Sequence, residues 1–286
     1  MRIAVTGSEG FVGKYLKAQL QITGQHEIIP LDLALGIDLS DETCLQQVPQ
    51  FDVVIHLAGL SFVPDSFKLP ALFYRKNYMM TLNVLELCRM YNSKIVYVSS
   101  YVYGNPVYLP IDEKHPLAAY NPYAQTKLMG EQLCQAYHRD FNVNGIVIRP
   151  FNIYGPGQNP SFLIASIICQ MQKGQKIVLQ DAKPRRDFVF VEDVADALVR
   201  AALNNEIGFD AFNVSSGESH SVEEIAQMLV TASRKDDYQI EYKTAERRSY
   251  DIMEVRGSFD KISSQLGWKP QTSLQDGLER SLQGSQ

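Results

Sequence analysis

Three glycines near the start of the chain, Gly7, Gly10 and Gly13, restrict its fold more than any other feature. They lie between a short apolar strand predicted at 3–5 and a helix predicted at 11–22. In such a turn the first glycine permits the tight bend, the second lets the backbone approach a diphosphate, and the third allows close helix–strand packing. The free N–H groups of the helix then attract phosphates. The pattern predicts a βαβ unit that binds a dinucleotide.

In the rest of the first 150 residues, short β-branched segments continue to alternate with longer helical patterns. Apolar strands with little alternation, separated by helices, predict a parallel sheet that is covered on both faces. The fold class is therefore α/β, a doubly wound sheet of the Rossmann type whose ligands lie at the carboxyl ends of the strands. The further predicted strands are 27–31, 53–57, 95–98 and 145–149, and the further predicted helices are 41–47, 67–91, 122–139 and 160–173.

After Pro150 the elements become shorter and are interrupted by glycine and proline. A helix predicted at 192–204 still belongs to the larger unit. We therefore expect a dinucleotide-binding domain of residues 1–150 plus about 187–215. A smaller α/β lobe, about 151–186 and 216–286, is expected to bind the substrate across one shared cleft.

Composition excludes several classes of protein. The 286 residues carry a net charge of −5 without a dense basic run, which disfavours nucleic-acid binding. No apolar segment approaches the about 20 residues of a membrane-spanning helix, and no charged leader precedes an apolar stretch. The four cysteines are far apart and lack a CxxC pair, so we expect no metal site. A cytoplasmic protein with reduced cysteines is the expectation.

Asp32 follows the second predicted strand, about twenty residues beyond the glycines. A carboxylate there would accept hydrogen bonds from the adenosine ribose and repel a 2′-phosphate. This favours NAD(H), with NADP(H) as the alternative. A simple turn aspartate would look the same, and Asp38 or Asp41 are alternative candidates for the residue that faces the cofactor.

A second motif, Asn121-Pro-Tyr-Ala-Gln-Thr-Lys127, begins a predicted helix with an N-cap and a proline at the first helical position. Tyr123 and Lys127 are four residues apart and share one helix face. An adjacent ammonium is expected to lower the pKa of the phenol, so that the tyrosine exchanges a proton near neutral pH. Ser99 and Ser100 end the fourth predicted strand and supply hydroxyls at the same edge of the sheet.

Together these motifs resemble the extended short-chain dehydrogenase/reductases, specifically the nucleotide-sugar enzymes of the NAD-dependent epimerase/dehydratase family. The resemblance covers almost the whole chain and includes TGSEGFVG (6–13), HLAG (56–59), SSYVYG (99–104), YAQTK (123–127), RPFNIYGPGQ (149–158), RRDFVFVEDV (185–194) and LGWKP (266–270). It implies a catalytic triad of Ser99, Tyr123 and Lys127. Ser99 is selected because the family's serine or threonine precedes the glycine of the YG pair, here Gly104, by five residues. The resemblance also implies that Lys127 binds the nicotinamide ribose.

The resemblance assigns further roles by position. Residues 56–59 should line the cofactor, although His56 itself is expected to be a packed core histidine. The implied cofactor-binding residues, besides those above, are Phe11, Val12, Asp38, Leu39, Leu57, Ala58, Gly59 and Pro150. The implied substrate-binding residues are Ser61, Val63, Ser99, Ser100, Asn152, Arg186, Arg247 and Arg248. The arginines suit phosphate groups because the planar guanidinium presents several N–H donors that can bind two phosphate oxygens at once.

The neighbours of Ser99 discriminate between the reactions of the family. Its 4,6-dehydratases carry an acidic pair after that residue, whereas this chain has Ser100 and Tyr101, so dehydration is disfavoured. Segments 54–67, 149–166 and 255–270 resemble the reductases of nucleotide-linked 4-keto-6-deoxyhexoses, such as the GDP-4-keto-6-deoxy-mannose reductases. The expected function is reduction of the C4 ketone. The alternative is a 4-epimerase with tightly bound NAD, and a non-catalytic dinucleotide sensor is a third possibility.

The family also implies a homodimer in which two long helices of each subunit form a four-helix bundle. The helices predicted at 67–91 and 122–139 would supply this interface, with apolar residues at Met79, Leu82 and Leu85. Packing of this face within the monomer is the alternative. The expected partner in catalysis is a nucleoside-diphosphate sugar.

Overall fold

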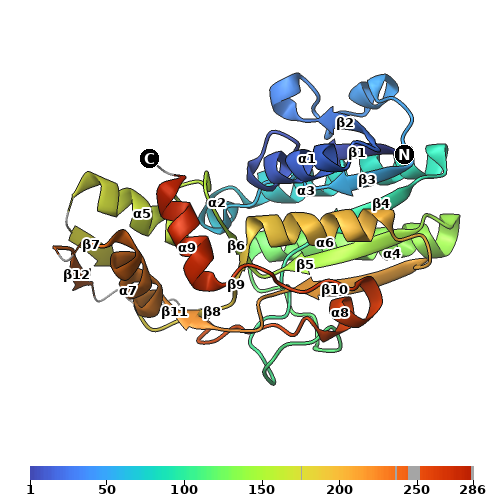
Figure 1. The fold of residues 1–286 in the computed structure, drawn as a ribbon. Coiled ribbons are helices and arrows are strands. Elements are labelled where there is room, and N and C mark those ends of the chain that lie inside the picture. The colour runs from blue at the N-terminus through green and yellow to red at the C-terminus, as the bar shows by residue number, and fades with distance from the viewer. Residues whose placement is uncertain (175, 236, 244–251, 285–286) are drawn as a thin grey trace.

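The computed structural model of the chain describes residues 1–174, 176–235, 237–243 and 252–284. Its centre is a parallel sheet of six strands in the order β10-β5-β4-β3-β1-β2 (Figure 1). The order reverses direction beside β1, as expected for a doubly wound sheet. The strands are β1 (Arg2–Thr6), β2 (Glu27–Leu31), β3 (Val53–His56), β4 (Lys94–Val98), β5 (Gly145–Pro150) and β10 (Phe209–Val214).

The five predicted strands of the first half are confirmed within one residue at each end. The sixth, β10, was not predicted, although its segment falls within the expected larger domain. It pairs in parallel with β5, from Phe209 opposite Gly145 to Val214 opposite Pro150. Its sequence, FDAFNV, mixes polar with apolar residues because the first half of the strand is only half-buried.

Helices cover both faces of the sheet (Figure 1). On one face, α1 (Phe11–Thr23) and α6 (Val191–Leu203) pack on strand residues such as Val5 and Val96. On the other face, α3 (Pro70–Tyr91) and α4 (Pro122–Phe141) pack on residues such as Val54 and Tyr97. Because successive strand side chains point to opposite faces, each strand contributes to both cores. The predicted Rossmann-type α/β fold is confirmed.

Two predicted helices differ in detail. The helix predicted at 67–91 is divided into α2 (Val63–Lys68) and α3, with the break at Leu69. Pro70 explains the break, because proline lacks an N–H and sterically excludes the preceding helical turn. The weak helix predicted at 41–47 is a 3₁₀ segment, η2 (Glu42–Gln47), and η1 (Leu33–Leu35) is a second one.

The smaller lobe lies beyond the carboxyl ends of the sheet strands and contains α5, α7, α9 and short strand pairs (Figure 1). The hydrophobic core of this lobe is formed by residues of α5, α7, α9, β7 and β9. The elements are α5 (Leu163–Lys173), β7 (Lys176–Leu179), β8 (Arg185–Arg186), β9 (Phe188–Phe190), β11 (His220–Ser221), α7 (Val222–Ser233), β12 (Gln239–Tyr242) and α9 (Leu274–Gln283). β6 (Asn152–Tyr154) pairs with β9 and links the lobe to the sheet.

One segment departs from the expected division into domains. Helix α8 (Asp260–Leu266) and Trp268 follow residue 216 and were therefore expected in the smaller lobe. Ile262 and Trp268 are instead fully buried in the core between the sheet, α1 and α6. The indole Nε1 of Trp268 donates to the carbonyl of Asp193 at 2.9 Å, which fixes it to α6.

Helices that are both long and apolar enough to cross a bilayer are absent from the described part of the chain. The helices expected to form a dimer interface, α3 and α4, differ from expectation at one residue. Leu85 is fully buried in the core between α3, α4 and the sheet, so its side chain is not available to a partner subunit. Met79 and Leu82 are half-buried.

Candidate active site

The glycine turn lies against the end of β3. Gly7 has a φ of 67°, and its N–H donates to the carbonyl of Leu31 at 2.8 Å. A Cβ on Gly7 would lie 3.0 Å from the backbone N of Ala58, and a Cβ on Gly13 would lie 2.3 Å from the carbonyl oxygen of Gly7. Side chains at these positions would therefore separate α1 from the turn and the turn from β3.

Helix α1 begins at this turn without a side-chain cap. Its N-cap is Gly10, which is exposed and has no side chain to occupy the first N–H groups. Phe11 and Val12 follow in the first turn and pack partly against the core of the smaller lobe. The uncapped helix end is thus open to an anion.

Asp32 lies at the end of β2, beside the glycine turn. One carboxylate oxygen accepts from the N–H of Glu9 at 2.9 Å, and the other accepts from the N–H of Ala34 at 2.8 Å. These two bonds fix the half-buried carboxylate at the edge where the turn ends. At this position the carboxylate can accept a hydrogen bond from a ribose hydroxyl, and it would repel a 2′-phosphate.

Asp38, the other predicted acidic candidate, is bound to Lys76 of α3 at 2.7 Å and to Ser40. These hydrogen bonds lower the pKa of Asp38 to about 2. The neighbouring Leu39 is buried, and Asn83 of α3 donates to its carbonyl at 2.8 Å. The loop after β2 is therefore attached to α3 at residues 38 to 40.

Lys127 is a buried cation that reaches the end of β4. Its Nζ donates to the carbonyl of Val98 at 2.8 Å and lies 5.3 Å from the centre of the Tyr97 ring. A Cβ on Gly59 would lie 3.6 Å from the same Nζ. Burial lowers the pKa of Lys127 to about 8. The structure thus brings Lys127, residues 57–59 and the glycine turn to one edge of the sheet.

Tyr123 is placed in the first turn of α4, which Asn121 caps by accepting from the N–H of Ala124 at 2.7 Å. Burial raises the pKa of Tyr123 to about 12, against the expectation of a lowered value, and the Ser100 side chain offsets only part of this increase. Desolvation disfavours the charged phenolate more than the surroundings stabilise it.

Ser99 contacts a carboxylate that was not predicted as a site residue. Its Oγ lies 2.5 Å from Oε1 of Glu131, whose carboxylate pairs with Arg149 at 2.6 Å. Glu131 was not predicted, but its spacing could have revealed it, since it lies four residues beyond Lys127 and shares a helix face with Lys127 and Tyr123. Ser99 is 2% exposed, whereas Ser100 is half-buried.

His56 is a packed core residue, as expected. Its Nδ1 lies 2.7 Å from Oγ1 of Thr6, and its Nε2 lies 3.2 Å from Oγ1 of Thr81. Burial lowers the pKa of His56 to about 3. The neutral ring therefore supports the turn of residues 57–59 and carries no charge at neutral pH.

Two of the predicted substrate residues, Asn152 and Arg186, lie in the short strands β6 and β8. Asn152 accepts from the Tyr101 hydroxyl at 3.3 Å and donates to the carbonyl of Asp187 at 2.9 Å. Half-buried Arg186 is in β8, and its Nη1 donates to the carbonyl of Arg185 at 2.9 Å. The remaining predictions lie as follows: Ser61 is exposed, Val63 begins α2, Pro150 ends β5, and Arg247 and Arg248 are outside the described residues.

Asp187 of the RRDF motif was not predicted as a site residue. Its fully buried carboxylate accepts from the N–H and the hydroxyl of Ser216, at 2.7 and 2.8 Å. It also accepts from the N–H groups of Gly217 and Gly257, each at 3.1 Å. Burial outweighs these bonds and raises the pKa of Asp187 to about 6. The Asp187 side chain therefore connects its own segment to the backbone at 216–217 and at 257, at the boundary between the sheet and the lobe.

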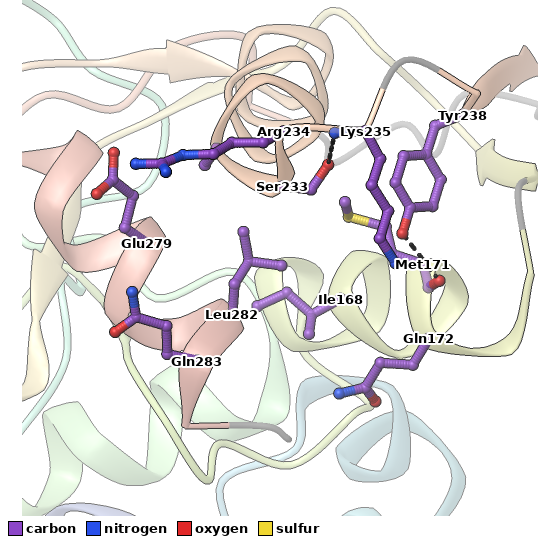
Figure 2. Close-up of a pocket in the computed structure, with 11 residues that line it drawn as sticks. Ile168, Met171, Gln172, Ser233, Arg234, Lys235, Tyr238, Glu279, Leu282 and Gln283 are labelled. Atoms are coloured by element: carbon purple, nitrogen blue, oxygen red, sulfur yellow. Dashed lines mark hydrogen bonds between the residues drawn. The ribbon is translucent and has the colours of Figure 1, made fainter.

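A cavity of about 420 Å³ lies elsewhere, between α5, α7 and α9 (Figure 2). Its floor is apolar, with Ile168, Met171 and Leu282, and its rim carries charged residues such as Arg234 and Glu279. None of the predicted site residues lines it. The edge of the sheet that holds Tyr123 and Lys127, and not this cavity, gathers groups for proton transfer.

Residues 3–215 match the family model described as "NAD dependent epimerase/dehydratase family". The chain belongs to this family. Its members in this comparison include an enzyme from Pseudomonas aeruginosa, "GDP-6-deoxy-D-mannose reductase", which is 35% identical over 97% of this chain and 94% of its own. Several UDP-glucose 4-epimerases also match, at 28 to 31% identity. This protein is therefore an enzyme of the NAD-dependent nucleotide-sugar epimerase and reductase group.

Two solved structures of the family resemble this one closely. RMD from Pseudomonas aeruginosa, complexed with NADPH, has a TM-score of 0.90 and 32% identity, covering 99% of this chain and 98% of its own. The Thermus thermophilus UDP-glucose 4-epimerase, in complex with NAD, has a TM-score of 0.89 and 28% identity with the same coverage. Family neighbours thus bind either nicotinamide dinucleotide.

The residues of this chain fit such a dinucleotide. The open N-terminus of α1 offers N–H groups to a diphosphate, and Asp32 stands at the ribose edge of the glycine turn. Lys127 and Gly59 stand at the other end, beside Tyr123. When bound, the group would supply hydride chemistry at this end of the site.

Proposed function

We propose that this family member reduces the C4 ketone of a nucleotide-linked 4-keto-6-deoxyhexose. The observation that carries the proposal is the 35% identity to the GDP-6-deoxy-D-mannose reductase over 97% of this chain. The Tyr123 phenol supports it, because burial raises its pKa to about 12. Reduction of a ketone begins with a proton donor beside the carbonyl oxygen, whereas oxidation of an alcohol begins with a base. A tyrosine that is neutral at physiological pH is suited to the first of these roles.

Tyr123 then transfers its proton to the oxygen that becomes the C4 hydroxyl. A serine hydroxyl at the end of β4 holds the same oxygen, and the resemblance to the family assigns this role to Ser99. The ammonium of Lys127, four residues along the same helix face, stabilises the phenolate that remains after proton transfer. Below its pKa of about 8, Lys127 carries the charge that this role needs.

Dehydration is the least suitable of the family's reactions for this site. The hydroxyl-bearing residues Ser100 and Tyr101 follow Ser99, where a dehydratase needs an acid and a base. Neither side chain is a carboxylic acid or a carboxylate base. The Tyr101 ring is moreover stacked on the Phe151 ring, with 5.3 Å between the ring centres, and its hydroxyl donates to Asn152. The Tyr101 side chain is therefore held in place as part of the wall of the proposed site.

We further propose that the nucleoside diphosphate lies toward the smaller lobe, where Asn152 and Arg186 stand, with Arg247 and Arg248 assisting. Asp32 supports NAD(H) as the preferred cofactor. The expected homodimer would form through α3 and α4, whose side chains Met79 and Leu82 remain partly accessible. The lobe that binds substrate would consist mainly of 151–186 and 216–286, without α8.

A 4-epimerase is the second candidate, because UDP-glucose 4-epimerases match the chain almost as well as the reductase does. One experiment separates the two. The purified protein is mixed with NADH or NADPH and a panel of 4-keto-6-deoxy sugar nucleotides, and the absorbance at 340 nm is followed. A reductase consumes the free dinucleotide. An epimerase retains bound NAD and interconverts two sugar nucleotides without a net change, and that outcome would refute the proposal.

A further inference from the structure

His56 is buried at the end of β3, and each nitrogen of its ring lies beside a hydroxyl. Nδ1 lies 2.7 Å from Oγ1 of Thr6, the last residue of β1, and Nε2 lies 3.2 Å from Oγ1 of Thr81 in α3. Thr6, His56 and Thr81 are 0%, 1% and 2% exposed. The three side chains therefore form a buried chain of hydrogen bonds that runs from the start of the glycine turn to α3.

The partners at the two ends of this chain fix the direction of each hydrogen bond in it. The backbone carbonyl of Asn77 only accepts, so Thr81 gives its single proton to that oxygen, at 2.9 Å. The Thr81 oxygen then accepts from His56, which places the ring proton on Nε2. A neutral imidazole has one N–H, so Nδ1 accepts the proton of the Thr6 hydroxyl. The Thr6 oxygen in turn accepts from the N–H of Ala58, at 3.0 Å.

The side chain of Asn77 holds the same backbone segment two residues further on. Its Oδ1 accepts from the N–H of Leu60 at 2.8 Å, and its Nδ2 donates to the carbonyl of Leu60 at 3.0 Å. Gly59 lies between the two held residues, and a Cβ there would lie 3.4 Å from Asn77 Oδ1 and 3.6 Å from Lys127 Nζ. The segment from Ala58 to Leu60 is thus fixed at both ends, beside the buried ammonium and the glycine turn.

We propose that His56 and Thr81 are positioning residues for the dinucleotide, because they fix the segment 58–60 that faces it. Thr6 and Asn77 pass their effect to the backbone of the segment. His56 acts as one fixed tautomer, with an acceptor at Nδ1 and a donor at Nε2. The inference rests on the proposed function, since it concerns the dinucleotide of that reaction. Loss of the Thr81 hydroxyl would leave the Nε2–H of His56 buried without an acceptor and would loosen the segment.

The test compares Thr81→Val, which removes the hydroxyl and keeps a branched side chain, with Thr81→Ser, which retains the hydroxyl. The Kd of the dinucleotide, NADH or NADPH, is followed by its fluorescence. Thr81→Val should raise this Kd about tenfold, as expected when a buried donor loses its partner. In Thr81→Ser the Kd should return to within about threefold of the wild-type value. At saturating dinucleotide, kcat should change much less than the Kd does.

Thr231→Val is the matched control. The Thr231 hydroxyl makes the same kind of bond, to the carbonyl of Gln227 four residues earlier, at 3.0 Å, but it lies at the exposed surface of α7. This variant should bind the dinucleotide as the wild type does. A Kd that stays at the wild-type value in Thr81→Val, or that rises equally in Thr81→Ser, would overturn the inference.

A second measurement uses the wild type alone. In protein labelled with ¹⁵N-histidine, and with the signals assigned by His56→Gln, the His56 ring should be neutral and protonated at Nε2, in mild acid as at neutral pH. A ring protonated at Nδ1 would reverse the hydrogen bonds and overturn the inference, while the proposed function would stand. A wild type that binds neither dinucleotide would refute the proposed function, and the role of His56 and Thr81 with it.

Discussion

Arg149 and Glu131 form an ion pair of 2.6 Å between β5 and α4, and each side chain is only 7% exposed. The pair lies directly behind Ser99, so the charge of Glu131 is balanced where the active site meets the core. A buried pair of this kind contributes little net stability over an apolar pair, but the loss of one partner leaves an uncompensated charge.

Arg149→Met should therefore lower the free energy of unfolding by about 3–5 kcal/mol, as measured by urea denaturation. The matched control is Arg139→Met, because Arg139 pairs with Asp140 at the surface, with 72% and 44% of the two side chains exposed. That variant should change stability by less than about 1 kcal/mol. Equal effects of the two substitutions would contradict the argument from burial.

Tyr123→Phe should reduce turnover by about 10²–10⁴-fold, because the variant lacks the proton donor and keeps the ring. Binding of the dinucleotide, followed by its fluorescence, should change little. Tyr108→Phe is a suitable control, since this exposed tyrosine bonds only with Asp112 among the described hydrogen bonds of its side chain. Full turnover of Tyr123→Phe would exclude Tyr123 as the donor.

The pH dependence of the reaction should reflect Lys127. Burial lowers its pKa from 10.5 to about 8, so the ammonium is present below pH 8 and is lost as the pH rises through that value. Stabilisation of the Tyr123 phenolate needs this charge, so kcat/KM should fall on the basic side with an apparent pKa near 8. In Lys127→Arg the fall should disappear, because a guanidinium stays charged. An unchanged basic limb in that variant would assign it to another group.

Asp187 should make the protein more stable in mild acid. Its folded pKa of about 6 lies above the ordinary value of 3.8, so the native state binds more protons than the unfolded state between these values. This contribution to stability is present at low pH and is lost as the pH rises through 6. On going from pH 7.5 to 5, wild type should gain about 1 kcal/mol relative to Asp187→Asn in urea unfolding. Parallel pH profiles of the two proteins would contradict the shifted pKa.

Gly13→Ala should weaken both the fold and the cofactor site. The added Cβ would lie 2.3 Å from the Gly7 carbonyl oxygen, so α1 must move away from the turn. A loss of about 1–3 kcal/mol in stability and a weaker dinucleotide affinity are expected. In Gly174→Ala, the control, the new Cβ has no heavy atom within 4 Å, and the φ of 172° is ordinary extended backbone. Stability and affinity should stay as in wild type there.

Asp32→Asn should improve the use of NADPH relative to NADH. The substitution removes a negative charge at the ribose edge and keeps an oxygen that accepts from the N–H of Glu9. The ratio of kcat/KM values for the two dinucleotides, measured with one sugar nucleotide, checks this. Asp38→Asn is the control, because that carboxylate is already bound by Lys76. An unchanged ratio in Asp32→Asn would place the discrimination elsewhere.

Local sequence patterns were sufficient to predict five strands of the sheet, its covering helices and the two motifs at its carboxyl edge. Strands β1 to β5 are continuous apolar segments, and the turn at Gly7–Gly13 has a backbone requirement that few other residues meet. The helix start at Asn121 and Pro122 was equally local, since the cap and the fixed φ act within one turn. These features depend on neighbours along the chain.

Only the tertiary structure decided what the site groups do. The sequence places Ser99 at the end of β4, but its hydrogen-bond partner Glu131 comes from α4, across the face of the sheet. The pKa of Tyr123 also depends on the tertiary structure. Desolvation by the groups that surround the ring raises it, whereas the sequence pattern predicted only the effect of the lysine four residues away. Burial and hydrogen-bond direction are long-range properties, so the chemistry of the strand end was fixed by packing.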